Sequence, residues 1–360
     1  MTTIPFLEDF KISTFHPTTD ETIFISRGLM EHIKWPIRCL DSKSAPEKSV
    51  LVRSRVKTQG YTVKLHCVGN QKLDEIATRL PELFLHNECK IIKSEKKIRV
   101  VRMPLRIGQT IKSVYIKQHN ALSCWHRLAS LFCASPALRS LSGAAAVLQE
   151  GYATARPIAA VEHRRRGVLI RSFYLAEEIA GAKTIADYWR EDLLSLKGID
   201  GHLKRRAVLR TLACLFKSLH EKRIYHNDLK ASNILARDRG STTKEMYSLI
   251  DLQGLRKCFY LSKRRRIKNL AQINRTLGNH LTTTEKLSFI KAYIGDEISD
   301  RRYARHLIRS ILKETSRQIM KARWRPLTAE KHQPSLEAGS AVDELGKTKA
   351  AARRLGEVFL

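Results

Sequence analysis

The apolar positions of the chain predict strands in its first half and helices in its second half. Residues 204–222 place apolar side chains on one face of a helix, at Val208, Leu212, Leu215, Phe216 and Leu219. Shorter apolar runs predict strands, at 49–56, 61–68, 89–103, 113–117 and 168–179. A helix near 137–148 falls among these runs. The pattern predicts an α+β fold with a β-rich N-terminal lobe and a helical C-terminal lobe.

Changes in composition divide the chain into four parts. The expected parts are an N-terminal extension of unknown role that could extend the first lobe, an N-terminal lobe with a hinge, a helical lobe and a mobile tail, at 1–85, 86–179, 180–325 and 326–360. In the helical lobe, Thr282-x-x-Glu285 is a capping box that predicts the start of a helix, which Gly295 ends. The tail has few large apolar side chains, so no packed core is expected there.

The most informative motif is the run Ile-Tyr-His-Asn-Asp-Leu-Lys-Ala-Ser-Asn-Ile-Leu at 224–235. Asn233 lies five residues after Asp228, and Asp251-Leu-Gln-Gly follows eighteen residues after Asn233. In protein-kinase-like phosphotransferases, an Asp accepts the proton of the substrate hydroxyl, while an Asn and a second Asp hold the metal that bridges the ATP phosphates. The spacing predicts Asp228 as the base, with Lys230 as a second catalytic candidate. It predicts Asn233 and Asp251 as ligands of the metal.

The segments around this motif favour a catalytic loop over an ordinary polar loop. The helix predicted at 204–222 precedes it, and residues 234–236 can pair with 246–250 across a turn. Such a hairpin would return Asp251 to the neighbourhood of Asn233. A polar loop that carried the first motif by chance would lack these neighbours.

Lys117, which ends the strand Ser-Val-Tyr-Ile-Lys, is the candidate for contact with the nucleotide phosphates. No Gly-x-Gly-x-x-Gly precedes it, so the turn at 93–97 would cover phosphates only with backbone N–H groups and lysine charge. Residues 118–149 contain no Asp or Glu, so the next helix cannot offer Lys117 the usual carboxylate. The remaining candidates for its partner are Asp251, Glu88 and Glu95.

The chain is strongly basic, with 66 Lys and Arg against 35 Asp and Glu and a net charge of +31. This excess requires an anionic partner or counterions. Lys263, Arg264, Arg265 and Arg266 follow Asp251 closely and are the candidate surface for an acidic acceptor or an anionic membrane. Nucleic acid would use the same charge, but no zinc-finger spacing, aromatic ribonucleoprotein strand or basic zipper accompanies it. Nucleic acid is therefore the less favoured partner.

Seven cysteines are scattered without a Cys-x-x-Cys pair, which favours neither a disulfide framework nor a zinc site. Cys214 is expected on the buried side of its helix. Neither an apolar run of about 18 residues nor a signal peptide is visible. The sequence predicts a cytoplasmic protein, or one that is peripheral on the inner membrane.

These segments together resemble the lipopolysaccharide kinase family, the bacterial enzymes that phosphorylate Kdo or heptose in the inner core of lipopolysaccharide. The resemblance runs from about residue 89 to 277, and its most specific segments are 114–117, 151–162, 226–233, 249–256 and 266–277. It implies a two-lobed protein-kinase-like fold, ATP with Mg²⁺ or Mn²⁺, and transfer of the γ-phosphoryl group to a sugar hydroxyl. The implied partner is lipopolysaccharide or its lipid A-core precursor, at the cytoplasmic face of the inner membrane.

Two positions depart from related patterns. Asn269 stands where many relatives carry an Asp, which leaves the role of that carboxylate in anchoring the helix open. In many protein kinases an Arg beside the catalytic His binds the phosphorylated activation loop. Asn227 takes its place here, which argues against control by phosphorylation of that loop. Two alternatives remain: a kinase of another small hydroxylated molecule, and an inactive kinase-like adaptor at the membrane surface.

Overall fold

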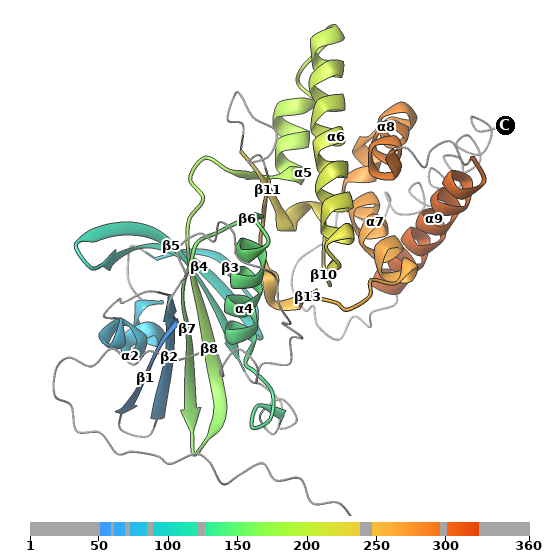
Figure 1. Ribbon diagram of the computed structural model, residues 1–360. Helices are drawn as coiled ribbons and strands as arrows, with labels where there is room; N and C mark the ends of the chain where they lie inside the picture. The colour runs from blue at the N-terminus through green and yellow to red at the C-terminus, as the bar shows by residue number, and fades with distance from the viewer. Residues whose placement is uncertain are drawn as a thin grey trace, which may run out of the picture.

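The computed structural model describes residues 51–58, 61–68, 73–84, 89–120, 127, 129–237, 247–295 and 301–323, which form two lobes (Figure 1). The N-terminal lobe is built on one sheet, and the C-terminal lobe is mainly helical. This is the α+β, two-lobed architecture that the sequence predicts. The predicted tail at 326–360 lies outside the described residues.

The N-terminal sheet has seven strands in the order β1-β2-β7-β8-β5-β4-β3. They are β1 (Leu51–Thr58), β2 (Tyr61–Val68), β3 (Lys90–Ser94), β4 (Ile98–Ile107), β5 (Thr110–Asn120), β7 (Pro157–Arg165) and β8 (Val168–Glu177). Because β2 pairs with β7, the strands predicted at 49–56 and 61–68 extend this sheet. The apolar run at 89–103 divides into β3 and β4, which are joined by a turn closed by the Glu95 N–H and the Ile98 carbonyl at 2.8 Å.

Two helices, α2 (Asp74–Leu83) and α4 (Pro136–Gln149), cover opposite faces of the sheet (Figure 1). Neighbouring residues of a strand point to opposite faces, and β7 follows this rule. Val161 packs in the cluster that includes α2, whereas Ala160 packs with α4. The helix predicted near 137–148 is thus present and lies beside the central strands.

The C-terminal lobe is organised around α6 (Gly198–Glu221), which packs against α8 (Thr283–Ile294), while α7 (Lys263–Leu277) packs against α9 (Arg301–Arg323). The shorter helical segments are α5 (Ile185–Asp187), the π-helix η1 (Tyr188–Leu193) and the 3-10 helices η2 (Ala231–Asn233), η3 (Leu252–Gly254) and η4 (Gly278–His280). The capping box of Thr282 and Glu285 opens α8 as predicted. The prediction for Cys214 is wrong: its side chain is exposed, because the buried face of α6 passes through Leu212 and Phe216.

Short strands place the candidate catalytic segments between the two lobes. β10 (Ile224–His226) pairs with β13 (Leu255–Lys257), and β11 (Ile234–Ala236) pairs with β12 (Tyr247–Leu249), β9 (Lys183–Thr184) lying on the other side of β11. β6 (Ala153–Thr154), directly after α4, runs parallel to β12. The β11–β12 hairpin confirms the prediction that the chain turns back after the catalytic loop. Across the part of the chain that the structure describes, no helix is long and apolar enough to cross a membrane.

Candidate active site

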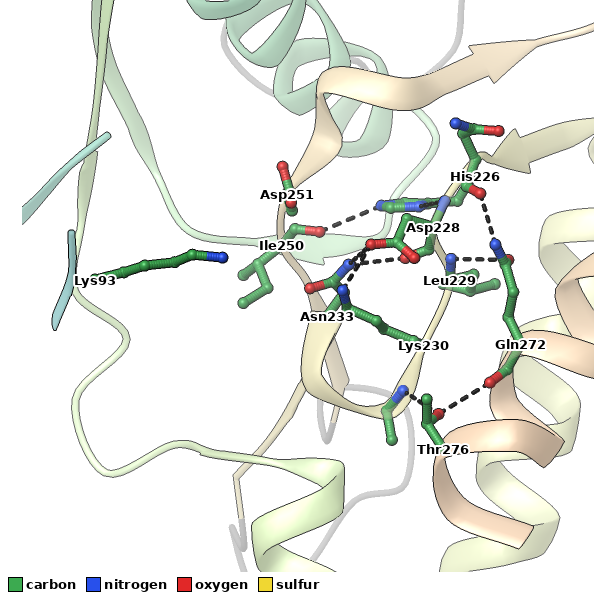
Figure 2. Close-up of polar contacts among 12 residues, drawn as sticks. Lys93, His226, Asp228, Leu229, Lys230, Asn233, Ile250, Asp251, Gln272 and Thr276 are labelled. Carbon is green, nitrogen blue, oxygen red and sulfur yellow. Dashed lines mark hydrogen bonds and ion pairs between the residues drawn. The ribbon is translucent and has the colours of Figure 1, made fainter. Parts of the chain in front are cut away.

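The candidate base, Asp228, lies on the loop between β10 and η2 (Figure 2). Its carboxylate accepts a hydrogen bond from Nδ2 of Asn233 at 3.1 Å and forms an ion pair with Nζ of Lys230 at 2.8 Å. Nδ2 of Asn233 also donates to the backbone carbonyl of Asp228 at 2.8 Å. The loop therefore brings the three residues into one polar cluster, with Asp228 still partly open to solvent.

His226 joins this loop to the segment that carries Asp251. Its Nδ1 accepts the backbone N–H of Asp228 at 3.1 Å, and its Nε2 lies 3.2 Å from the carbonyl oxygen of Ile250, to which it donates. Burial lowers the pKa of His226, although the hydrogen bond to Ile250 opposes this effect. The imidazole is therefore neutral and serves to hold the loop, since both of its nitrogens are occupied.

Asn269 of α7 holds the loop from below. The side chain is fully buried, and its Nδ2 donates to the carbonyl of His226 at 2.6 Å and to Oε1 of Gln272 at 2.9 Å. The sequence left the anchoring role open, because an amide replaces the carboxylate of many relatives. The structure shows that the amide makes an anchor of its own, as a donor to a backbone carbonyl.

Two further residues of α7, Gln272 and Thr276, hold the loop and were not identified from the sequence. Gln272 donates to the carbonyl of Asn227 at 2.6 Å and accepts the N–H of Leu229 at 3.0 Å, while Thr276 accepts the N–H of Ala231 at 3.0 Å (Figure 2). A signal was present in the sequence. Polar residues spaced by three and four positions lie on one helix face, and here that face is otherwise buried.

Lys117 and Asp251 meet between the lobes. Nζ of Lys117, on β5, lies 2.6 Å from Oδ1 of Asp251. Asp251 adopts a left-handed backbone conformation with φ of 57°, which turns the chain sharply out of β12. Burial alone would raise the pKa of the Asp251 carboxyl, but the charge and hydrogen bond of Lys117 outweigh it and lower the pKa. Among the partners left open by the sequence, Lys117 has Asp251, whereas Glu95 pairs with Lys93 at 2.9 Å.

The oxygen atoms of Asn233 and Asp251 suit a hard cation. The Asn233 amide nitrogen is used by Asp228, so its Oδ1 remains for a ligand, and the N–H of Ile250 donates to the Asn233 carbonyl at 3.0 Å, beside Asp251. The described residues contain no cluster of three or more His, Cys, Asp or Glu side chains that could hold a metal. Mg²⁺ typically binds through one or two protein oxygens together with substrate phosphates. The donor set fits that pattern.

The helix α4 contacts the Asp251 segment through a glycine. A β-carbon at Gly143 would overlap the backbone carbonyl of Leu252, the residue after Asp251. The helix therefore supports this segment by close backbone packing, although it offers no carboxylate to Lys117. Glu150, at the end of α4, pairs instead with Lys257 and Lys222.

Lys93, near the end of β3, lies on the side of the N-terminal lobe that faces the candidate site. In Figure 2 the ammonium group of Lys93 points from the N-terminal lobe towards Ile250 and Asp251. Its side chain is half exposed and is paired with Glu95. A lysine replaces glycine-rich backbone at this edge of the site.

The predicted basic run, residues 263–266, forms the first turn of α7, and the helix directs its side chains to different surroundings. Arg264 and Arg265 line a cavity on the surface, whereas Arg266 faces the buried Tyr293. Lys263 is exposed and does not line the cavity. The four residues thus differ in their exposure and in what they contact.

A protein-family model described as "Lipopolysaccharide kinase (Kdo/WaaP) family" matches residues 136–293. This stretch belongs to the lipopolysaccharide kinase family. It covers α4 to nearly the end of α8 and includes the candidate residues Asp228, Asn233 and Asp251, but it begins after Lys117. The match confirms the resemblance that the motifs indicate and supports a phosphotransferase.

A solved structure described as "WaaP in complex with acyl carrier protein" is also similar to this chain. It has a TM-score of 0.47 and 21% sequence identity, over 70% of this chain and 99% of that chain. No curated protein matches the sequence.

Proposed function

We propose that the protein is an ATP-dependent kinase that transfers the γ-phosphoryl group to a sugar hydroxyl, of Kdo or heptose, in the inner core of lipopolysaccharide. The observation that carries this proposal is the meeting of Lys117 with Asp251 beside the Asp228–Asn233 cluster. Phosphoryl transfer requires mainly positioning and charge stabilisation. These four side chains, drawn from both lobes, can supply both.

Asp228 is the proposed base. Its carboxylate takes the proton of the acceptor hydroxyl as the oxygen forms a bond to the γ-phosphorus and the bond to the ADP oxygen breaks. Lys230, 2.8 Å from that carboxylate, holds it in place and adds positive charge where the transferred group passes. Lys117 contacts the nucleotide phosphates from β5.

Asn233 and Asp251 would hold Mg²⁺ or Mn²⁺. When bound, the cation neutralises charge on the β- and γ-phosphates. The lowered pKa of the Asp251 carboxyl supports this role, because the group stays ionised and available as a ligand at neutral pH.

We place the enzyme at the cytoplasmic face of the inner membrane, as a peripheral protein. The net charge of +31 supports attraction to an anionic surface, since each nearby Lys or Arg contributes about 1 kcal/mol. The acceptor would be lipopolysaccharide or its lipid A-core precursor, in keeping with the family's description.

Incubation of the full chain with radiolabelled ATP, Mg²⁺ and lipid acceptors that end in Kdo or in heptose tests the proposal. We expect label in one lipid, loss of transfer in Asp228→Asn, and unchanged transfer in Asp200→Asn, a matched change at an exposed position of α6. ATP binding without transfer to any acceptor would favour the inactive adaptor. Transfer only to small hydroxylated molecules would favour the other alternative.

A further inference from the structure

A basic cavity opens at the beginning of α7, beside the catalytic loop. It has a volume of about 560 Å³. Its lining combines β10, the segment before α7, α7 and α9, through Tyr225, Tyr260, Ser262, Arg264, Arg265, Lys268, Glu314 and Arg317. Such a volume is in the range of small-molecule sites, roughly 300–1,000 Å³.

The positive charge of this cavity is only partly compensated. Arg317 forms two hydrogen bonds with the Glu314 carboxylate, at 2.6 and 2.7 Å. Hydrogen bonding to Arg317 lowers the pKa of the Glu314 carboxyl, so the two residues form a pair with no net charge. Arg264, Arg265 and Lys268 have no carboxylate at ion-pair distance among the described residues. The cavity therefore carries an excess of three cations.

Aromatic contacts hold two of these cations in place. The guanidinium of Arg265 lies 5.4 Å from the ring centroid of Tyr225, and Nζ of Lys268 lies 5.7 Å from the same centroid. Cations over an aromatic face are attracted by its quadrupole. Both charges are thus held against the Tyr225 ring, and an anion bound in the cavity would offset their positive charge.

The cavity is joined to the catalytic loop through Asn227. Nζ of Lys268 donates to Oδ1 of Asn227 at 3.1 Å, and the hydroxyl of Tyr225 donates to the same atom at 3.4 Å. Asn227 immediately precedes Asp228. A group bound in the cavity therefore lies next to the segment that carries the base.

We propose that this cavity binds an anionic substituent of the acceptor, a phosphate or a sugar carboxylate, and so directs the neighbouring hydroxyl towards Asp228. The inference rests on the proposed function, because it names how the same site selects its acceptor. Arginine forks match both groups in a bidentate manner. The site comprises Arg264, Arg265 and Lys268, and it excludes Lys263 and Arg266 of the sequence-predicted run.

Acceptor kinetics test the proposal with two variants of equal charge. Arg264→Gln/Arg265→Gln should raise the KM for a Kdo-lipid A acceptor roughly 10- to 100-fold, the loss expected for hydrogen bonds to charged groups, without raising the KM for ATP. The matched control Arg309→Gln/Lys313→Gln removes two exposed cations of α9 that lie outside the cavity lining. Equal effects of the two variants would overturn the proposal, because they would show a general surface attraction.

Two modified acceptors identify the anion. Removal of the lipid A phosphates, or reduction of the Kdo carboxylate to an alcohol, should by itself raise the wild-type KM and abolish the difference between the wild type and Arg264→Gln/Arg265→Gln. The modification that has this effect names the group. If neither modification changes the KM, the cavity does not read an anion and the proposal fails.

A binding measurement separates this inference from the proposed function. Flotation of Asp228→Asn protein with phosphatidylcholine vesicles that contain Kdo-lipid A requires no turnover. Binding should be lost when Arg264→Gln/Arg265→Gln is added and retained when Arg309→Gln/Lys313→Gln is added. Selective loss without any phosphotransfer by the wild type would support the cavity and refute the kinase assignment. Equal binding by both variants would refute the cavity alone.

Discussion

Replacing Asn269 with Leu should separate the support of the catalytic loop from the stability of α7 in general. Leucine keeps the branched arrangement of heavy atoms but removes the donors to the His226 carbonyl and to Oε1 of Gln272. Both acceptors lie in a buried region. The substitution therefore leaves the His226 carbonyl without its donor, whereas Oε1 of Gln272 keeps the N–H of Leu229, and no cavity is created.

The expected loss follows from one unsatisfied acceptor and one further lost hydrogen bond. A buried acceptor left unsatisfied costs about 1–3 kcal/mol and a lost hydrogen bond about 1 kcal/mol, so Asn269→Leu should lower the free energy of unfolding by roughly 2–4 kcal/mol. This is a large part of the ~5–15 kcal/mol that stabilises a typical protein. Because the His226 carbonyl lies two residues before Asp228, kcat should fall as well.

Urea unfolding and steady-state kinetics measure the two effects, with Asn274→Leu as the matched control. Asn274 lies on the same helix, is half-buried, and donates to Thr315 of α9 at 3.1 Å, away from the catalytic loop. Its replacement should cost about 1 kcal/mol and leave kcat intact. If Asn269→Leu matches the control in both measurements, the anchoring role of Asn269 is refuted.

Five other substitutions test the site and the stability of the lobe that carries it. Asp228→Asn and Asp251→Asn should each lower kcat by about 10²-fold or more with unchanged unfolding midpoints, and a fully active variant would contradict the role of that residue. Lys117→Met should raise the KM for ATP. Because burial alone raises the pKa of the Asp251 carboxyl, Mg²⁺-dependent nucleotide binding should also be lost at a higher pH than in the wild type. An unchanged pH profile of binding argues against the Lys117–Asp251 ion pair. Gly143→Val should reduce kcat by displacing the segment that carries Asp251. Normal nucleotide binding and normal kcat in this variant would contradict the supporting role of α4. Burial lowers the pKa of His220 from 6.5 to about 4, so between these pH values the unfolded chain binds a proton that the folded chain does not. The free energy of unfolding should therefore fall by about 3 kcal/mol from pH 7 to pH 4. His220→Gln should reduce this pH dependence, and an unchanged slope would refute the role of His220.

The catalytic loop could be predicted from the sequence because its geometry is local. Asp228 and Asn233 lie on one short loop, which fixes their spacing. The antiparallel pairing of β11 with β12 returns the chain to this loop, and Asp251 follows two residues after the end of β12. The helix before the loop was equally clear, since its apolar face is long and regular. These parts depend on contacts between residues that are close in the chain.

The supports of the loop could not be predicted in the same way, because they are long-range contacts. Gln272 and Thr276 bond to backbone groups more than forty residues earlier, and no local pattern says which backbone atoms they will meet. Gly143 matters only because the loop after Asp251 packs against α4. The exposure of Cys214 was not predicted for a simpler reason. Cys214 lies just outside the buried face of α6, and the residue type alone does not show where that face ends.

The missing carboxylate of α4 explains why Lys117 lies on Asp251. In a site with a helix carboxylate, the lysine has a partner that is not a metal ligand; here its partner is the proposed ligand itself, at 2.6 Å. A cation bound to Asp251 would face the ammonium of Lys117 at close range, and the resulting repulsion favours movement of that ammonium towards the phosphates. Metal and nucleotide should therefore bind together more tightly than either does alone, since the phosphates supply the anion that Lys117 gives up.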